Sequence, residues 1–215
     1  MIKASRKELT EAIKWSRKNS PVAYLVFSMN RKWGVPDENP QNIVSSFRKY
    51  WPETRDYLSS QALMNFKGNG KLRMVDLEIN YPVEKVKAQI LTDFFDLTSR
   101  MTGYLDRTEE YAYLETYCED MLSLFVWKDS SADIWKGTEI YALDKQGKEE
   151  QAYQMYRDCE GPGEQLAAMY SQALLDRCDT ERAGEVLDPF RESTDPDIQD
   201  KIRLLDQLKA VKGMR

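Results

Sequence analysis

The side chains that could carry chemistry are carboxylates, tyrosines, lysines and cysteines, because the 215-residue chain contains no histidine. Without histidine it cannot build a Ser-His-Asp triad, a Cys-His pair or an H-E-x-x-H zinc site. Cys118, Cys159 and Cys178 are widely spaced and form no C-x-x-C pair, which predicts free thiols rather than a disulfide framework or a zinc site. An enzyme on this chain would need carboxylates, Lys, Tyr or a metal held by Asp and Glu.

Three pairs of carboxylates lie on segments with helical periodicity, and acid–base catalysis is the chemistry that such pairs could offer. The pairs are Asp93 with Asp96, Glu119 with Asp120, and Glu149 with Glu150. At these spacings the side chains point largely outward, which favours a solvated surface, and no D-x-D-x-D-G calcium loop is present. We therefore predict no catalytic residue, no metal and no cofactor, with a carboxylate- or metal-dependent hydrolase as an alternative.

Basic side chains gather near the N-terminus, on one face of a helix predicted over residues 6–18. Ser5 and Glu8 fit a capping box at the start of this helix. Residues 1–50 hold ten Lys/Arg against four Asp/Glu, a net charge of +6, whereas residues 101–150 hold five against twelve, a net charge of −7. The basic face includes Arg6, Lys7, Lys14, Arg17 and Lys18.

This basic face could meet an acidic protein, anionic lipid, nucleic acid or the chain's own acidic region 106–150, although a solvated face is the simplest interpretation. No Gly-rich phosphate loop or nucleic-acid motif accompanies it, so nucleic acid is not favoured as a partner. The longest apolar run, Val22 to Phe27, is far shorter than the ~20 residues that span a bilayer. Residues 1–18 lack the apolar stretch of a signal peptide, so a soluble, cytoplasmic protein is expected.

The elements that must position these side chains are predicted to be helices, because apolar residues recur at helical spacing along most of the chain. Residues 31–39 are predicted to form a loop, and Pro52 is expected to end or bend a helix. Val22 to Met29 could be helix or strand. The Asn69-Gly70 turn permits a short β-hairpin near 62–81, although a helix over 71–81 is favoured. Besides residues 6–18, helices are predicted over 40–51, 53–66, 83–104 and 109–124.

From residue 134 onward the pattern becomes more specific. Trp135 lies within one position of an expected early aromatic, Gly147 stands at a turn, Ala152 is a small residue in the next helix, and Tyr156 is an aromatic four residues later. This arrangement resembles a tetratricopeptide repeat. A weaker copy follows, in which Ala183 stands 31 residues after Ala152, near the family's period of about 34 residues.

The resemblance, which is clearest over 134–190, implies an all-α, superhelical stack of antiparallel helix pairs over residues 40–215. Residues 1–39 would form a separate basic helix and an irregular region, and a final helix over 196–209 would cover the last pair. Two departures weaken the match: Ile140 occupies a position that the family keeps small, and Pro162 is displaced from the closing proline. An irregular helical bundle is the alternative.

In tetratricopeptide arrays the first helix of each pair lines a groove that usually holds a peptide. The resemblance thus implies a non-catalytic adaptor or scaffold that binds a protein or peptide; a dedicated inhibitor or immunity-type protein with one target is an alternative. An exposed Trp135 beside charges would suit an interface hot spot, and core packing is the competing interpretation. The partner-binding residues implied in this way are Trp135, Lys136, Glu139, Arg100, Asp93 and Gln172.

Overall fold

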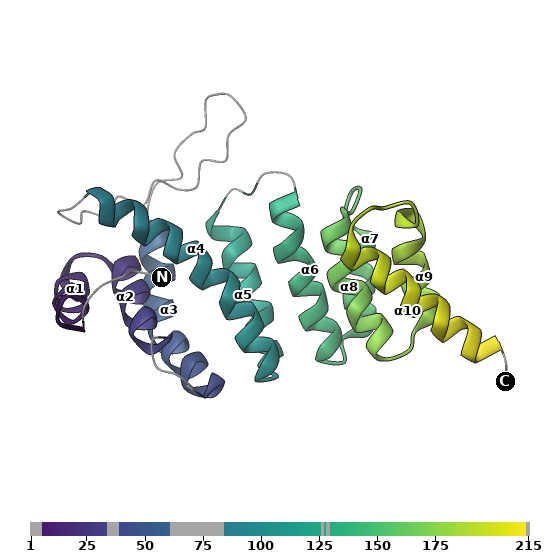
Figure 1. Ribbon diagram of the computed structural model, residues 1–215, viewed down its shortest axis with the longest axis horizontal. Coiled ribbons are helices and arrows are strands. Elements are labelled where there is room, and N and C mark those ends of the chain that lie inside the picture. The colour runs from purple at the N-terminus through teal and green to yellow at the C-terminus, as the bar shows by residue number, and fades with distance from the viewer. Residues whose placement is uncertain (1–5, 34–38, 61–83, 126, 128–129, 214–215) are drawn as a thin grey trace, which may run out of the picture. The chain divides into compact units, whose positions relative to one another are not determined.

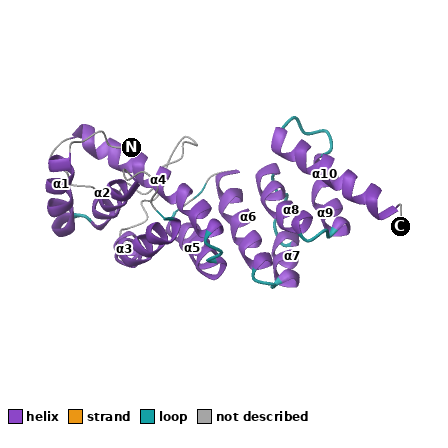
Figure 2. Cartoon of the chain, turned by 60° about the horizontal axis from the view of Figure 1, so that its bottom comes forward, coloured by secondary structure: helices purple, strands orange, loops and turns teal. Residues whose placement is uncertain are grey.

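All regular structure in the described part of the chain is helical, as Figures 1 and 2 show. This computed structural model describes residues 6–33, 39–60, 84–125, 127 and 130–213. The predicted all-α class is confirmed. Residues 61–83, which hold the possible β-hairpin near 62–81 and the alternative helix over 71–81, lie outside the described residues.

Contacts divide the chain into two compact units. Unit 1 comprises Met1–Glu110 and Leu124–Val126, and unit 2 comprises Tyr111–Ser123 and Trp127–Arg215. Residues on both sides of position 39, where a domain boundary was predicted, fall in unit 1. The helices of unit 1 are α1 (Arg6–Asn19), α2 (Pro21–Trp33), α3 (Pro40–Ser60) and α4 (Glu84–Arg107).

Helix α2 is the centre of unit 1, because α1, α3 and α4 all pack against it. Its apolar residues are buried around most of the helix, which explains why the run 22–29 lacks the periodicity of a surface helix. The sequence left helix and strand open for this run, and the structure shows helix. The helix also continues through residues 31–33, where a loop was predicted. The buried apolar residues are Val22, Ala23, Leu25, Val26, Phe27 and Met29.

Helix α3 continues through Pro52, so the prediction of separate helices over 40–51 and 53–66 is wrong. The buried face on both sides of the proline explains this. Before it, Trp51 stacks on Phe47 with ring centroids 5.3 Å apart; after it, Leu58 is buried on the same helix. The Thr54 hydroxyl also donates to the carbonyl of Pro21 on α2 at 3.3 Å. Burial of this face outweighs the roughly 3 kcal/mol that an interior proline costs.

From α6 onward, unit 2 alternates longer and shorter helices that pack on their neighbours. Helix α6 packs on α7 and α8, α8 packs on α9 and α10, and α9 packs on α10. Helix α5 contacts α6 through Tyr117, whose ring meets that of Trp135 edge-on at 5.9 Å. Ala152 and Tyr156, the two residues that anchor the tetratricopeptide resemblance, are both buried in the core of this unit. The helices are α5 (Tyr111–Leu124, whose last residue belongs to unit 1), α6 (Ser130–Lys145), α7 (Glu149–Arg157), α8 (Glu164–Asp176), α9 (Thr180–Leu187), the 3-10 helix η1 (Asp188–Phe190) and α10 (Pro196–Gly213).

Gly137 allows α6 and α8 to approach at backbone distance. A Cβ atom at this position would lie 2.9 Å from the Cβ of Met169 and 3.1 Å from the Cα of Leu166. Both distances are shorter than ordinary van der Waals contact, so only glycine fits without a shift of α8. Gly137 thus provides the close approach on this helix, although the tetratricopeptide pattern directs attention to the position of Ile140 instead.

The turns α4–α5, α6–α7 and α8–α9 share one hydrogen-bond pattern. In each, a residue with positive φ donates its N–H to the carbonyl three residues earlier, and the next N–H donates to the carbonyl five residues earlier. This is the Schellman arrangement, which satisfies the last carbonyls of a helix. The residues with positive φ are Glu109 (57°), Gly147 (79°) and Cys178 (61°). The three turns are therefore structurally equivalent, although only one of them contains glycine.

Glycine is expected to stabilise the two turns that lack it. We expect Glu109→Gly and Cys178→Gly each to raise the free energy of unfolding by about 0.5–1 kcal/mol, because relief of left-handed backbone strain exceeds the entropy that glycine adds to the unfolded chain. Gly147→Ala should lower it by about 1 kcal/mol for the same reason. Urea denaturation followed by circular dichroism measures all three variants, and equal effects at the three positions would contradict the common turn geometry.

Candidate functional site

The structure places Trp135 in the interior of unit 2 rather than on its surface. Its side chain is only 4% exposed, and its ring lies against Tyr117 and, at 5.6 Å, against Trp127. Helices α7 and α8 pack on α6, and side chains of α5 contact it, so positions along almost its whole circumference are buried. The sequence leaves exposure and core packing open for Trp135, and the structure shows core packing.

The other predicted partner-binding residues are divided between the two units, and two of them are buried. Asp93 is buried in unit 1, where it accepts a hydrogen bond from Asn30 at 3.3 Å, and Glu139 is buried in unit 2. Arg100 is exposed and pairs with Asp96 on its own helix, while Lys136 and Gln172 are half-buried in unit 2. Of the predicted basic face, Lys14, Arg17 and Lys18 are exposed on α1; the side chains of Arg6 and Lys7 lie outside the description.

The solvent-facing side of α6 carries different residues from those predicted. Ile134 is 43% exposed, and Tyr141 and Lys145 follow it at helical spacing on the same face. Lys145 lies 5.3 Å from the centre of the Tyr141 ring and binds Asp176 of α8 at 2.5 Å. The outward face of α6 is thus formed by Ile134, Tyr141 and Lys145. The predicted face was formed by Trp135, Lys136 and Glu139.

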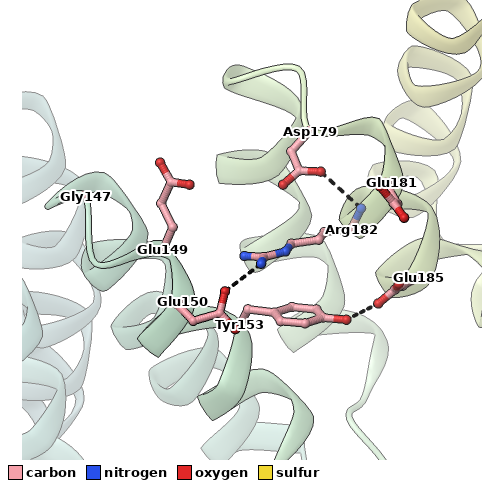
Figure 3. A pocket seen from close by; sticks show the side chains of 8 residues that line it. All are labelled: Gly147, Glu149, Glu150, Tyr153, Asp179, Glu181, Arg182 and Glu185. Atoms are coloured by element: carbon pink, nitrogen blue, oxygen red, sulfur yellow. Dashed lines mark hydrogen bonds and ion pairs between the residues drawn. The ribbon is translucent and has the colours of Figure 1, made fainter.

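A hollow of about 610 Å³ opens between α7 and α9 (Figure 3). It begins at the α6–α7 and α8–α9 turns and runs along the facing sides of the two short helices. Acidic side chains dominate its lining, with a single guanidinium and a single phenol among them. The lining residues are Gly147, Glu149, Glu150, Tyr153, Asp179, Glu181, Arg182 and Glu185.

Arg182 crosses the hollow from α9 to α7, as Figure 3 shows. It binds Glu150 at 2.6 Å and lies over the face of the Tyr153 ring, 4.3 Å from its centre. The Tyr153 hydroxyl donates a hydrogen bond back to Glu185, which raises the pKa of the phenol. One side of Tyr153 therefore already holds a cation, in the geometry of a cation–π contact.

The hollow keeps a net negative charge after its internal pairs are counted. Five carboxylates line it, whereas the only lining cation is Arg182. Arg177, just outside, pairs with Glu149 at 3.2 Å and with the buried Asp144 at 2.7 Å. Within the described part of the chain, no cation pairs with Glu181 on the rim of the hollow. Such a surface attracts cationic groups.

Polar contacts between successive helix pairs of unit 2 recur at nearly constant sequence separation. Glu115 accepts hydrogen bonds from Gln146 and Lys148, which lie 31 and 33 residues later. The Asp144–Arg177 and Glu150–Arg182 pairs are 33 and 32 residues apart. Lys145 with Asp176 and Tyr153 with Glu185 are separated by 31 and 32 residues. These separations are compatible with a helical repeat of about this length, and they do not depend on the apolar pattern from which the resemblance was drawn.

Comparisons with known proteins identify no family for this chain. No family model, curated protein or solved structure matches it. Among the described residues, no three Cys, Asp or Glu side chains are grouped so that they could hold a metal ion. None of the described helices is both long and apolar enough to cross a membrane.

Proposed function

We propose that unit 2 is a tetratricopeptide-like binding module that holds a protein or peptide partner and catalyses no reaction. The regular separation of 31–33 residues between contacts of successive helix pairs supports this proposal most directly. Repeats that contact only their neighbours build extended surfaces, and such surfaces are used for binding. The cysteines are unpaired, which fits a reducing compartment such as the cytoplasm.

The hollow between α7 and α9 is the surface that we assign to the partner. Its excess of carboxylates suits a segment that carries lysine or arginine, because complementary charge steers association and sets specificity. Arg182 shows the contact that a partner's cation would make, since its guanidinium lies between a carboxylate and the Tyr153 ring. The partner is therefore expected to present a basic, extended or helical segment.

A charge-reversal experiment tests this assignment. Peptides selected by display against the purified protein should be rich in lysine or arginine. The double variant Glu181→Lys/Glu185→Lys should bind the selected peptides at least tenfold more weakly, a loss of about 1.4 kcal/mol or more. Isothermal titration calorimetry at low and high salt measures the effect, and binding by the wild-type protein should weaken as salt rises.

The matched control is Glu192→Lys/Glu160→Lys, which makes the same change in net charge at exposed positions outside the hollow. This control should keep most of the wild-type affinity. Equal weakening in both double variants would show that overall charge, rather than the hollow, governs binding. Selection of peptides without basic residues would contradict the assigned surface.

A further inference from the structure

Glu139 is a buried carboxylate that lacks a counter-ion. The residue is 7% exposed, and among the described residues it makes no hydrogen bond or ion pair. Asp144, one and a half turns later on α6, is also buried but binds Arg177 at 2.7 Å. An ionised carboxylate in Glu139's position is costly, because burial removes most of its hydration and no hydrogen-bond donor of the described residues replaces it. The neutral, protonated form avoids this cost.

The groups that face Glu139 disfavour its charge further. Helix α5 presents Glu119 and Glu115 to it, together with the buried thiol of Cys118. The end of α7 contributes Cys159, and no charged side chain of α8 is among the described groups that act on it. Lys136 on α6 opposes these effects without pairing to Glu139. Burial, followed by Glu119 and Glu115, raises the pKa of Glu139 to about 7.

The contact between α5 and α6 is made largely by aromatic rings. Tyr117 meets Trp135 edge-on, and Tyr111 meets Tyr141 with centroids 6.3 Å apart. Glu115, bound by Gln146 and Lys148, closes one end of the contact. Glu139 lies four residues after Trp135 on α6, so a charge that forms on it develops beside this interface.

We propose that Glu139 is a proton-controlled joint in unit 2: its protonated form allows α5 to pack closely on α6, and loss of the proton loosens that contact. An ionised Glu139 would draw in water and repel Glu119 across the interface. The change lies within the range of physiological pH, so small shifts in pH would alter the attachment of α5. This joint does not depend on the proposed peptide-binding function.

The direction of the pH dependence follows from proton binding. Between the ordinary value of 4.5 and about 7, folded Glu139 holds a proton that the unfolded chain has released. The contribution of Glu139 to the stability of unit 2 is therefore complete below 4.5, falls as pH rises through this window, and levels off above about 7. Carboxylates with lowered pKa values, such as Glu115, have the opposite effect: their contribution to stability increases as pH rises.

Hydrogen exchange of α5 and carboxyl NMR together test the joint. After correction for intrinsic exchange rates, amides of α5 in the wild-type protein should exchange about tenfold faster near pH 8 than near pH 6. In Glu139→Gln, which imitates the protonated form, protection should stay constant over this range. The control Glu192→Gln removes an exposed carboxylate outside the hollow and should behave like the wild type.

Glu119→Gln provides a second variant that leaves the buried position intact. Removal of this like charge should lower the NMR midpoint of Glu139, together with the midpoint of the exchange transition in α5. A wild-type midpoint for Glu139 below about 5.5, or a loss of α5 protection that persists in Glu139→Gln, would overturn the proposal. A shift of the Glu139 midpoint that leaves the α5 transition unmoved would also overturn it.

Discussion

Arg177→Ala is expected to lower the free energy of unfolding of unit 2 by about 2–3 kcal/mol. Arg177 binds Asp144 at 2.7 Å, and the Asp144 side chain is almost completely buried. Burial raises the pKa of Asp144 even though Arg177 lowers it, so this carboxylate depends on its partner. Truncation of the arginine leaves a buried acid without a counter-ion and also frees Glu149 and Asp179. The expected loss lies at the lower end for buried pairs, because Arg177 is partly exposed.

Thermal and urea unfolding of the variant measure this loss. Arg203→Ala on α10 is the matched control, since Arg203 pairs with an exposed Asp200 and its removal should change stability by less than about 0.5 kcal/mol. Asp144→Asn in the Arg177→Ala background should recover part of the loss, because a neutral amide costs less to bury than a charge. Similar losses in Arg177→Ala and Arg203→Ala would show that the buried pair has no special role.

Gly137→Ala is expected to cost about 1–3 kcal/mol, although alanine is normally the better helix former. The added methyl group would press on the Cβ of Met169 and the Cα of Leu166, and the second of these is backbone that cannot move without α8. The core around Leu166 and Tyr170 would have to shift with it. Urea denaturation gives the free energy, and hydrogen exchange of α8 shows whether the damage is local.

Gly103→Ala is the control for this substitution. Gly103 also lies within a helix, α4, but a methyl group there would meet no atom within 4 Å. The control should therefore stabilise the protein by about 0.5–1 kcal/mol through helix propensity alone. Stabilisation by both substitutions would show that α6 and α8 do not approach each other as closely as the structure indicates.

Helical periodicity was sufficient to predict the fold class and most helices, but local signals failed where tertiary packing outweighed them. Helix α3 shows this, because Pro52 is a strong local signal for a helix end. Phe47 and Leu58 are buried on both sides of it, and a sequence without an alignment does not reveal that they share one buried face. The left-handed turn at Cys178 is a similar case, because glycine is the residue that usually indicates such a turn in a sequence, and this turn has none.

The candidate site could be predicted only in part. The sequence does not decide whether Trp135 is exposed or packed in the core. Tyr117 and Trp127 cover it, and both precede the segment in which the repeat pattern is visible. The hollow was missed because its residues come from two helices that are short and mostly charged. A signal was present: Glu150 with Arg182 and Tyr153 with Glu185 are complementary pairs one repeat length apart. A search for such pairs in the sequence predicts that α7 and α9 lie side by side.

The enclosure of α6 separates the residues that maintain this architecture from those that can diversify. Substitutions at the buried positions of α6 disturb packing against α7 or α8, whereas the outward faces of α7 and α9 can change without touching the core. Related chains could therefore vary these two short helices, which line the surface proposed for the partner, while α6 remains almost invariant. The same property would make the proposed α7–α9 surface a natural starting point for engineering.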